Sequence, residues 1–170
     1  MNHAFVILQL EANLRTFEGL LHTSSQDEIM WRPAENKWCL LEIACHLFDE
    51  EREDFRTRLK HSLENPKDQL PSIDPVGWVI VRNYMGKNYE MVVQDFLKER
   101  EQSVQWLCSL QSPDWKSAHH HHKFGPMSAE MFLANWLAHD YLHIRQILRL
   151  KYEYLKQTSS EVSLKYAGDW

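Results

Sequence analysis

The stretch SAEMFLANWLAHDYLHIRQILRLKYEY (residues 128–154) predicts one long amphipathic helix. A four-residue spacing places His139 and His143 one above the other on a helix face, where both imidazoles can reach the same metal ion. Burying two histidines without partners is costly, so this face predicts a metal site, with hydrogen-bonded core histidines as the alternative. The inward-facing residues recur at helical spacing: Phe132, Asn135, Trp136, His139, His143, Gln146, Ile147 and Leu150.

Three further segments repeat apolar residues at the same period, residues 2–22, 39–63 and 88–110, and predict three more helices. Residues 65–87 contain several prolines and glycines and are too long for a tight turn between antiparallel neighbours. We therefore expect an all-α fold, a four-helix bundle with a long crossover between its second and third helices. Ser24 or Ser25 is expected to cap a short turn before Trp31.

The chain has 170 residues, enough for one domain, which we expect to span residues 1–170. Its net charge is -5, which argues against binding to nucleic acid or to an anionic membrane. We find no apolar run long enough to cross a bilayer and no leader pattern, and so expect a soluble, cytoplasmic protein. Cys39, Cys45 and Cys108 have no CxxC spacing, which argues against a disulfide framework or a thiolate zinc site.

His46, in the 39–63 helix, is a third candidate metal ligand. It lies at the edge of the apolar stripe of that helix, so the geometry permits but does not require it to face the ion. Three neutral imidazoles from two helices would hold Zn or Ni, with Fe or Mn as alternatives, and would leave coordination positions open. Open positions are typical of a catalytic site, in which a bound water can ionise near neutral pH.

Glu50 and Arg100 are the candidate catalytic residues. Glu50 continues the His46 side of its helix, so it could be a general base, a fourth ligand or an acceptor for an imidazole N–H. Glu53 is a weaker candidate for the same roles, and the alternative for both is a solvated acidic face. Arg100 occupies the centre of an apolar stripe, where it could form a buried ion pair with a carboxylate of the 39–63 helix such as Asp54, or clamp a substrate carboxylate.

The run from His119 to His122 precedes Gly125 and Pro126, so we expect it in the loop that enters the last helix. Four consecutive residues of a loop cannot all converge on one ion. The run therefore predicts a solvated loop that is independent of the metal site.

Residues spread over nearly the whole chain show a resemblance to one known family: Trp38, His46-Leu47-Phe48-Asp49, the proline-bearing crossover, Phe96 to Arg100, Phe124-Gly125 and the segment His139-Asp140-Tyr141-Leu142-His143-Ile144-Arg145-Gln146-Ile147. The resemblance is to the DinB-like superfamily. It implies an up-down-down-up four-helix bundle and a divalent metal held by three histidines, here His46, His139 and His143. One departure is Cys39, where similar sequences often have Ser, and this concerns the helix cap.

The resemblance implies three classes of function. The first is a metal-dependent enzyme, since similar proteins include low-molecular-weight thiol S-transferases, a thiol-dependent maleylpyruvate isomerase and metal-dependent hydrolases. The second is a noncatalytic metal-binding or stress-response protein, and the third is a helical interaction module. We take the first, with a small-molecule substrate such as a low-molecular-weight thiol and hydrolysis as the alternative; the sequence does not separate the two reactions. The resemblance and the 12% aromatic content also predict a homodimer.

Overall fold

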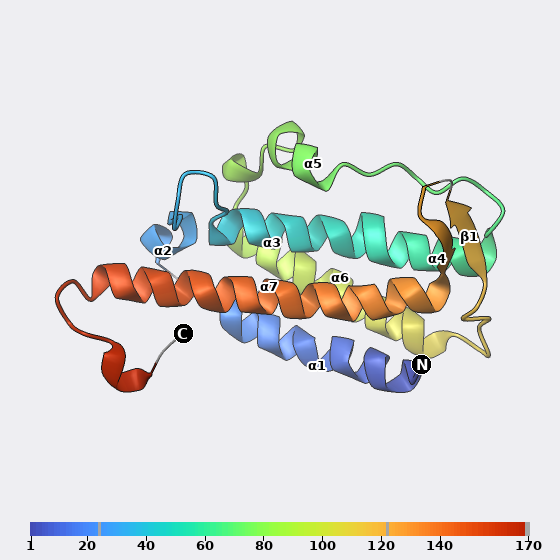
Figure 1. Cartoon of the computed structure of the whole chain (residues 1–170). Helices are drawn as coiled ribbons and strands as arrows, with labels where there is room; N and C mark the ends of the chain where they lie inside the picture. The colour runs from blue at the N-terminus through green and yellow to red at the C-terminus, as the bar shows by residue number, and fades with distance from the viewer. Residues whose placement is uncertain (24, 122, 169–170) are drawn as a thin grey trace.

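Four long helical segments form a bundle in the computed structural model, which describes residues 1–23, 25–121 and 123–168. They are α1 (His3–Leu21), a composite second helix, α6 (Tyr89–Ser109) and α7 (Ala129–Thr158). In Figure 1, α1 and α7 run in one direction along the bundle, and the two segments between them in the chain run in the other. The prediction of a mostly helical bundle is confirmed. A short turn of helix, η3 (Lys165–Ala167), follows α7.

The second helix changes its winding in the middle. It consists of α3 (Leu40–Asp49), the π-helical segment η1 (Glu50–Arg56) and α4 (Thr57–Glu64). A π-helix has more residues per turn than an α-helix, so it changes which side chains face the core. The buried residues of this segment are Glu50, Glu51 and Phe55. The sequence predicted a uniform helix here, so this segment is a correction.

Short polar side chains begin the other long helices. The side chains of Asn2, Asn88 and Ser128 each accept a hydrogen bond from a backbone N–H in the first turn of α1, α6 and α7. At the start of α3, the Glu42 carboxylate accepts the Cys39 backbone N–H at 2.9 Å. Ser25 caps the short helix α2 (Gln26–Met30), as one of the two predicted alternatives had it, whereas Ser24 lies outside the described residues.

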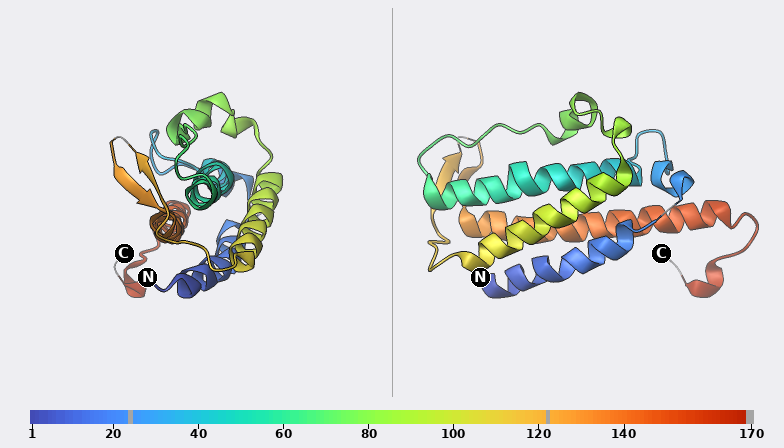
Figure 2. Two further views of the ribbon diagram at one scale, coloured as in Figure 1. Left: turned by 90° about the vertical axis from the view of Figure 1, so that its right-hand side faces the viewer. Right: turned by 180° about the vertical axis from the view of Figure 1, so that it is seen from behind.

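The crossover between the second helix and α6 contains α5 (Pro75–Val81) and the turn η2 (Tyr84–Gly86). Figure 2 shows this segment lying over the second helix. The Tyr84 hydroxyl donates to Asp49 at 2.6 Å, and Arg82 forms an ion pair with the same carboxylate at 2.7 Å. These contacts attach the crossover to the end of α3.

A two-stranded antiparallel hairpin, β1 (Ala118–His121) and β2 (Gly125–Ser128), precedes α7. It stands beside α4 and the beginning of α7 (Figure 2). The Ser117 hydroxyl donates to the Ser62 carbonyl at 2.5 Å and fixes the hairpin to α4. The prediction that His119 to His122 lie in a loop is therefore wrong for His119, His120 and His121, which belong to β1. His119 is also buried rather than solvated, whereas His120 is exposed as predicted, and His122 lies outside the described residues.

The core has two apolar clusters along the bundle axis. One surrounds Phe17 and Phe96, and the other surrounds Leu59 and Leu133. Arg100 is only 1% exposed and interrupts the apolar stripe of α6. No helix of the described chain has both the length and the apolar character needed to span a membrane.

Candidate metal centre

Three imidazoles meet between the second helix and α7. His46 comes from the last turn of α3, and His139 and His143 lie one turn apart on α7. The Nε2 atom of His139 lies 3.3 Å from that of His46 and 3.0 Å from that of His143. One ligand atom from each ring falls within 4.8 Å of the others, which is close enough for one ion to bind all three. The structure thus brings together the three histidines that the sequence singled out.

All three imidazoles are neutral at physiological pH. Burial lowers the pKa of His46 to about 3 and that of His139 to about 2, with further lowering from the neighbouring imidazoles. Burial also lowers the pKa of His143, although Gln146 and Asp140 oppose the shift. A neutral imidazole is the form that binds a metal, so no proton has to be displaced near pH 7.

The positions of the imidazole nitrogens suit binding of a cation better than hydrogen bonding among the three rings. The Nε2 atom of His139 lies within 3.3 Å of both other Nε2 atoms, and a neutral imidazole carries only one proton for its two nitrogens. The Nδ1 atoms of His46 and His143 are buried and have no hydrogen-bond partner in the described chain. If the protons are on these Nδ1 atoms, the Nε2 lone pairs face each other and are satisfied by a divalent ion.

Aromatic rings enclose the three histidines. The Trp38 ring lies 4.9 Å from that of His46, and the Phe55 ring lies 4.9 Å from that of His139. Phe55 also stacks on Trp136 at 5.9 Å, so the inward turn of the π-helical segment supplies one wall of the site. These rings are apolar neighbours of the imidazoles, and a less polar surrounding strengthens the interaction of a bound ion with its ligands.

Arg100 is the centre of a buried ion-pair network. Its guanidinium donates to Glu51 at 2.8 Å and to Asp140 at 2.6 Å, with a longer bond to the Leu10 carbonyl. These contacts and two more to the same carboxylates occupy all five of its N–H donors. Arg100 therefore has no donor left for a substrate carboxylate, and its expected clamp role is not supported. The predicted alternative, a buried ion pair with a carboxylate of the second helix, is present, but the carboxylate is Glu51 and not Asp54, which pairs with Arg58.

Glu50 and Asp54 form a carboxyl pair near the three histidines. Glu50 is 4% exposed, one turn beyond His46, and its Oε1 has no hydrogen-bond partner in the described chain. Burial and the neighbouring Asp54 raise the pKa of Glu50. Burial also raises the pKa of Asp54, against the opposing charge of Arg58. The pair can hold a proton above the usual range of a carboxyl group. Glu53 faces away and pairs with Arg82 at 2.7 Å.

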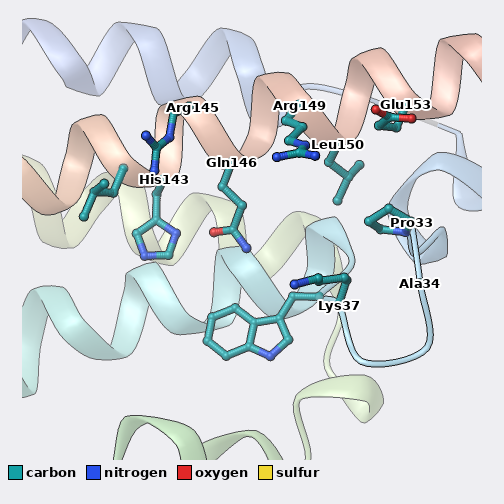
Figure 3. A pocket seen from close by; sticks show the side chains of 11 residues that line it. Pro33, Ala34, Lys37, His143, Arg145, Gln146, Arg149, Leu150 and Glu153 are labelled. Carbon is teal, nitrogen blue, oxygen red and sulfur yellow. The ribbon is translucent and has the colours of Figure 1, made fainter. Parts of the chain in front are cut away.

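Two cavities flank the three histidines. The first, which we call the Trp38 pocket, has a volume of about 950 Å³ and is lined by His143, Trp38, Lys37, Gln146 and Arg149, among others. Figure 3 shows His143 and Gln146 pointing from α7 across this cavity, with Lys37 and Pro33 on its other side. The second, the Met131 pocket, has a volume of about 710 Å³ and is lined by His139, Asp54, Phe55, Met127, Met131 and Phe132, among others. Leu142 borders both cavities.

Asp140, Asn13 and Glu51 are buried polar residues whose roles the sequence analysis missed. Asp140 has no exposed surface and accepts a hydrogen bond from the Asn13 amide at 3.0 Å in addition to its bonds with Arg100. Glu51 also accepts from the Trp136 indole at 3.0 Å. Asp140 lies four residues after Trp136 and seven before Ile147, both core residues, so helical spacing was a usable signal for it. Asn135, by contrast, was expected on the buried face but is exposed.

Two kinds of comparison bear on this arrangement. The family model of the DinB superfamily matches residues 9–147. Among solved structures, the chain is similar to YfiT from Bacillus subtilis, described as a probable metal-dependent hydrolase with an unusual four-helix bundle topology. The TM-score is 0.78 at 16% sequence identity, over 89% of this chain and 87% of YfiT. At this identity the likeness concerns the fold alone. No curated protein matches the chain in sequence.

The family model covers most of the chain, including His46, His139 and His143. It also spans the crossover and the hairpin, so the match does not depend on the histidine spacing alone. The chain therefore belongs to the DinB superfamily.

Proposed function

We propose that the protein is a divalent-metal-dependent enzyme that transfers a low-molecular-weight thiol to a small electrophilic substrate. The observation that carries the proposal is the position of the three histidines between two cavities, with His143 lining one and His139 lining the other. A hydrolase needs room for one organic substrate and a water molecule. A transferase needs room for two organic substrates that meet at one point.

The two cavities differ in chemistry, in a way that suits two different substrates. The Trp38 pocket carries Lys37, Arg145 and Arg149 beside the single carboxylate of Glu153, and these cations suit the carboxylates of a small thiol. The Met131 pocket is walled by Phe55, Phe132 and the two methionines near His139, and it suits a less polar electrophile.

A divalent ion held by His46, His139 and His143 would lower the pKa of a thiol or a water molecule bound to it. Zn or Ni suits this donor set best, with Fe or Mn as alternatives. The residues around the histidines have separate tasks. Trp38 and Phe55 form apolar walls beside the histidines, and Asp54, at the wall of the Met131 pocket and paired with Glu50, can take up a proton.

Hydrolysis is the second candidate, and the Glu50–Asp54 pair favours it. A carboxyl pair with raised pKa values beside the cavity that contains His139 suits a general base for a water nucleophile. In that reaction the base takes a proton from water, the oxygen attacks a carbonyl carbon, and the leaving group departs with a proton. The name of the YfiT structure agrees with this candidate.

Cobalt substitution separates the two reactions. Glutathione, bacillithiol, mycothiol and cysteine are added in turn to the cobalt-loaded protein, and the absorption spectrum is recorded. Thiol transfer predicts a thiolate-to-metal band for at least one thiol, absent in His143→Ala and weakened in the charge-reversed Arg149→Glu. Lys156→Glu, a charge reversal at an exposed site of α7 outside both cavities, should keep the band. If no thiol changes the spectrum while an ester or amide is turned over, hydrolysis replaces transfer.

A further inference from the structure

A third cavity contains the histidine run that the proposed function leaves unused. It has a volume of about 520 Å³ and lies between α4, the crossover and β1, and we call it the hairpin pocket. Five of its lining side chains are cationic or imidazole groups: Arg58, Lys67, His119, His120 and His121. None of its described lining residues is an aspartate or a glutamate. The whole chain has a net charge of -5, so this concentration of cationic and imidazole groups is a local feature.

The donors of this pocket are held by contacts behind them. Arg58 is fixed by an ion pair with Asp54 at 2.5 Å and a hydrogen bond to the Pro71 carbonyl at 3.2 Å. His119 is 9% exposed and packs edge-on against His61, with ring centroids 5.9 Å apart. Its Nδ1 has no hydrogen-bond partner in the described chain. A buried imidazole with an unpaired nitrogen is costly unless a ligand or a bound water satisfies it.

A metal ion is not the ligand that these groups favour. The described residues of this pocket contain no set of three ligand atoms as close as those of His46, His139 and His143. In addition, Arg58 and Lys67 would repel a cation. Guanidinium, ammonium and imidazole N–H groups around one cavity instead form charge-assisted hydrogen bonds with an anion.

The hairpin pocket adjoins the cavity at the three histidines. It shares Arg58, Ile73 and His121 with the Met131 pocket, whose other side is lined by His139. One elongated molecule could therefore extend from His139, past Arg58, to the hairpin.

We propose that the hairpin pocket binds a terminal anionic group, a phosphate or a carboxylate, of the substrate that occupies the Met131 pocket. The proposal rests on the proposed function for the reacting end of that substrate. The anion site itself is built from residues other than His46, His139 and His143. It adds a specificity determinant: the substrate is an elongated molecule with an electrophilic end and an anionic end.

The test uses alkyl hydroxamates of several chain lengths, because a hydroxamate binds a divalent ion without being turned over. Their far ends carry a phosphonate, a carboxylate or a neutral hydroxyl, and affinities for the zinc-loaded full chain are measured by titration calorimetry. We expect at one chain length an affinity about tenfold higher for an anionic end than for the hydroxyl. The phosphonate and carboxylate arms show which anion is preferred.

Two variants with the same charge change provide the contrast. Lys67→Glu should abolish the tenfold gain, because it places a carboxylate at the rim of the hairpin pocket. Lys156→Glu, which lies outside this cavity, should keep it. Equal affinities for charged and neutral ends in the wild type, or a gain that survives in Lys67→Glu, would overturn the proposal.

A separate experiment tests the anion site independently of the metal site. If no hydroxamate binds in a metal-dependent way, the proposed function fails, and the metal-free chain is titrated with inorganic pyrophosphate by NMR of the histidine rings. Saturable shifts of the His119 and His120 signals, lost in Lys67→Glu and kept in Lys156→Glu, support the anion site. Unchanged signals in the wild type overturn it.

Discussion

Acid should destabilise the metal-free protein through its buried histidines. The pKa of His46 is lowered to about 3 and that of His139 to about 2 from an ordinary value of 6.5. Below pH 6.5 the unfolded chain therefore binds protons that the folded chain does not, and stability falls as the pH falls. The loss develops from about pH 6.5 downward and is complete only below the folded pKa values.

The magnitude follows from the same values. At pH 5, protonation of one imidazole of pKa 6.5 stabilises the unfolded chain by about 2 kcal/mol, while His46 and His139 stay neutral in the folded chain. Together they should lower the free energy of unfolding by about 4 kcal/mol between pH 7 and pH 5, a large part of the stability of a domain of this size. His143 acts in the same direction. Glu50 acts in the opposite direction, because its raised pKa lets the folded chain hold a proton that the unfolded chain releases.

The assay is urea unfolding of the metal-free protein at pH 7 and pH 5, followed by far-UV circular dichroism. The contribution of His46 and His139 to the change in the free energy of unfolding is isolated by comparison with a variant that carries both His46→Asn and His139→Asn. Glu50 contributes equally to both proteins. The variant should lose about 4 kcal/mol less than the wild type between the two pH values. If both lose the same amount, the imidazoles are not buried in the neutral form and the reasoning is refuted.

Three further predictions concern the site, the core and the assembly. His139→Ala or His143→Ala should abolish tight stoichiometric metal binding in metal analysis, while the helical circular dichroism spectrum remains. Replacing His119 to His122 together should leave that binding intact. Metal retained in both single variants, or lost in the hairpin variant, would place the ion elsewhere. Arg100→Met should lower the free energy of unfolding by about 3–5 kcal/mol in urea titrations, because Glu51 and Asp140 stay buried without their cation. A loss below about 1 kcal/mol would contradict the ion-pair network. Sedimentation should detect a symmetric dimer, to which the exposed apolar side chains of α5 could contribute, and a clean monomer at micromolar concentration would contradict it.

The sequence alone determined the helical segments and the histidine pair. Helical periodicity is a local property that repeats every three to four residues, so it predicted the four long helices to within a few residues. The spacing of His139 and His143 is equally local, and it predicted that both rings lie on one face of α7. His46 was a weaker prediction, because it lies 93 residues from His139 and only the packing of two helices brings their rings together.

The partners of the charged residues depended on tertiary structure. Arg100 is separated from Glu51 by 49 residues and from Asp140 by 40, and no local pattern relates them. The sequence correctly indicated that Arg100 needs a counter-ion, because burial of a lone charge is costly, but several carboxylates were candidates. The packing of α6 against the second helix decided among them, since it places Glu51 against Arg100, whereas Asp54 pairs with Arg58 one turn along its own helix.

Tertiary structure also decided the role of the histidine run. Consecutive histidines near a glycine and a proline carry no strong signal for a strand, so a loop was the expectation. Strand pairing with β2 and the Ser117–Ser62 contact make it a hairpin edge instead, with His119 buried against His61. The sequence by itself therefore determined where the long helices run and that His139 and His143 share one face, because helical periodicity depends on neighbouring residues. Only the tertiary structure decided which faces meet and what cavities they enclose, because those contacts join residues far apart in the chain.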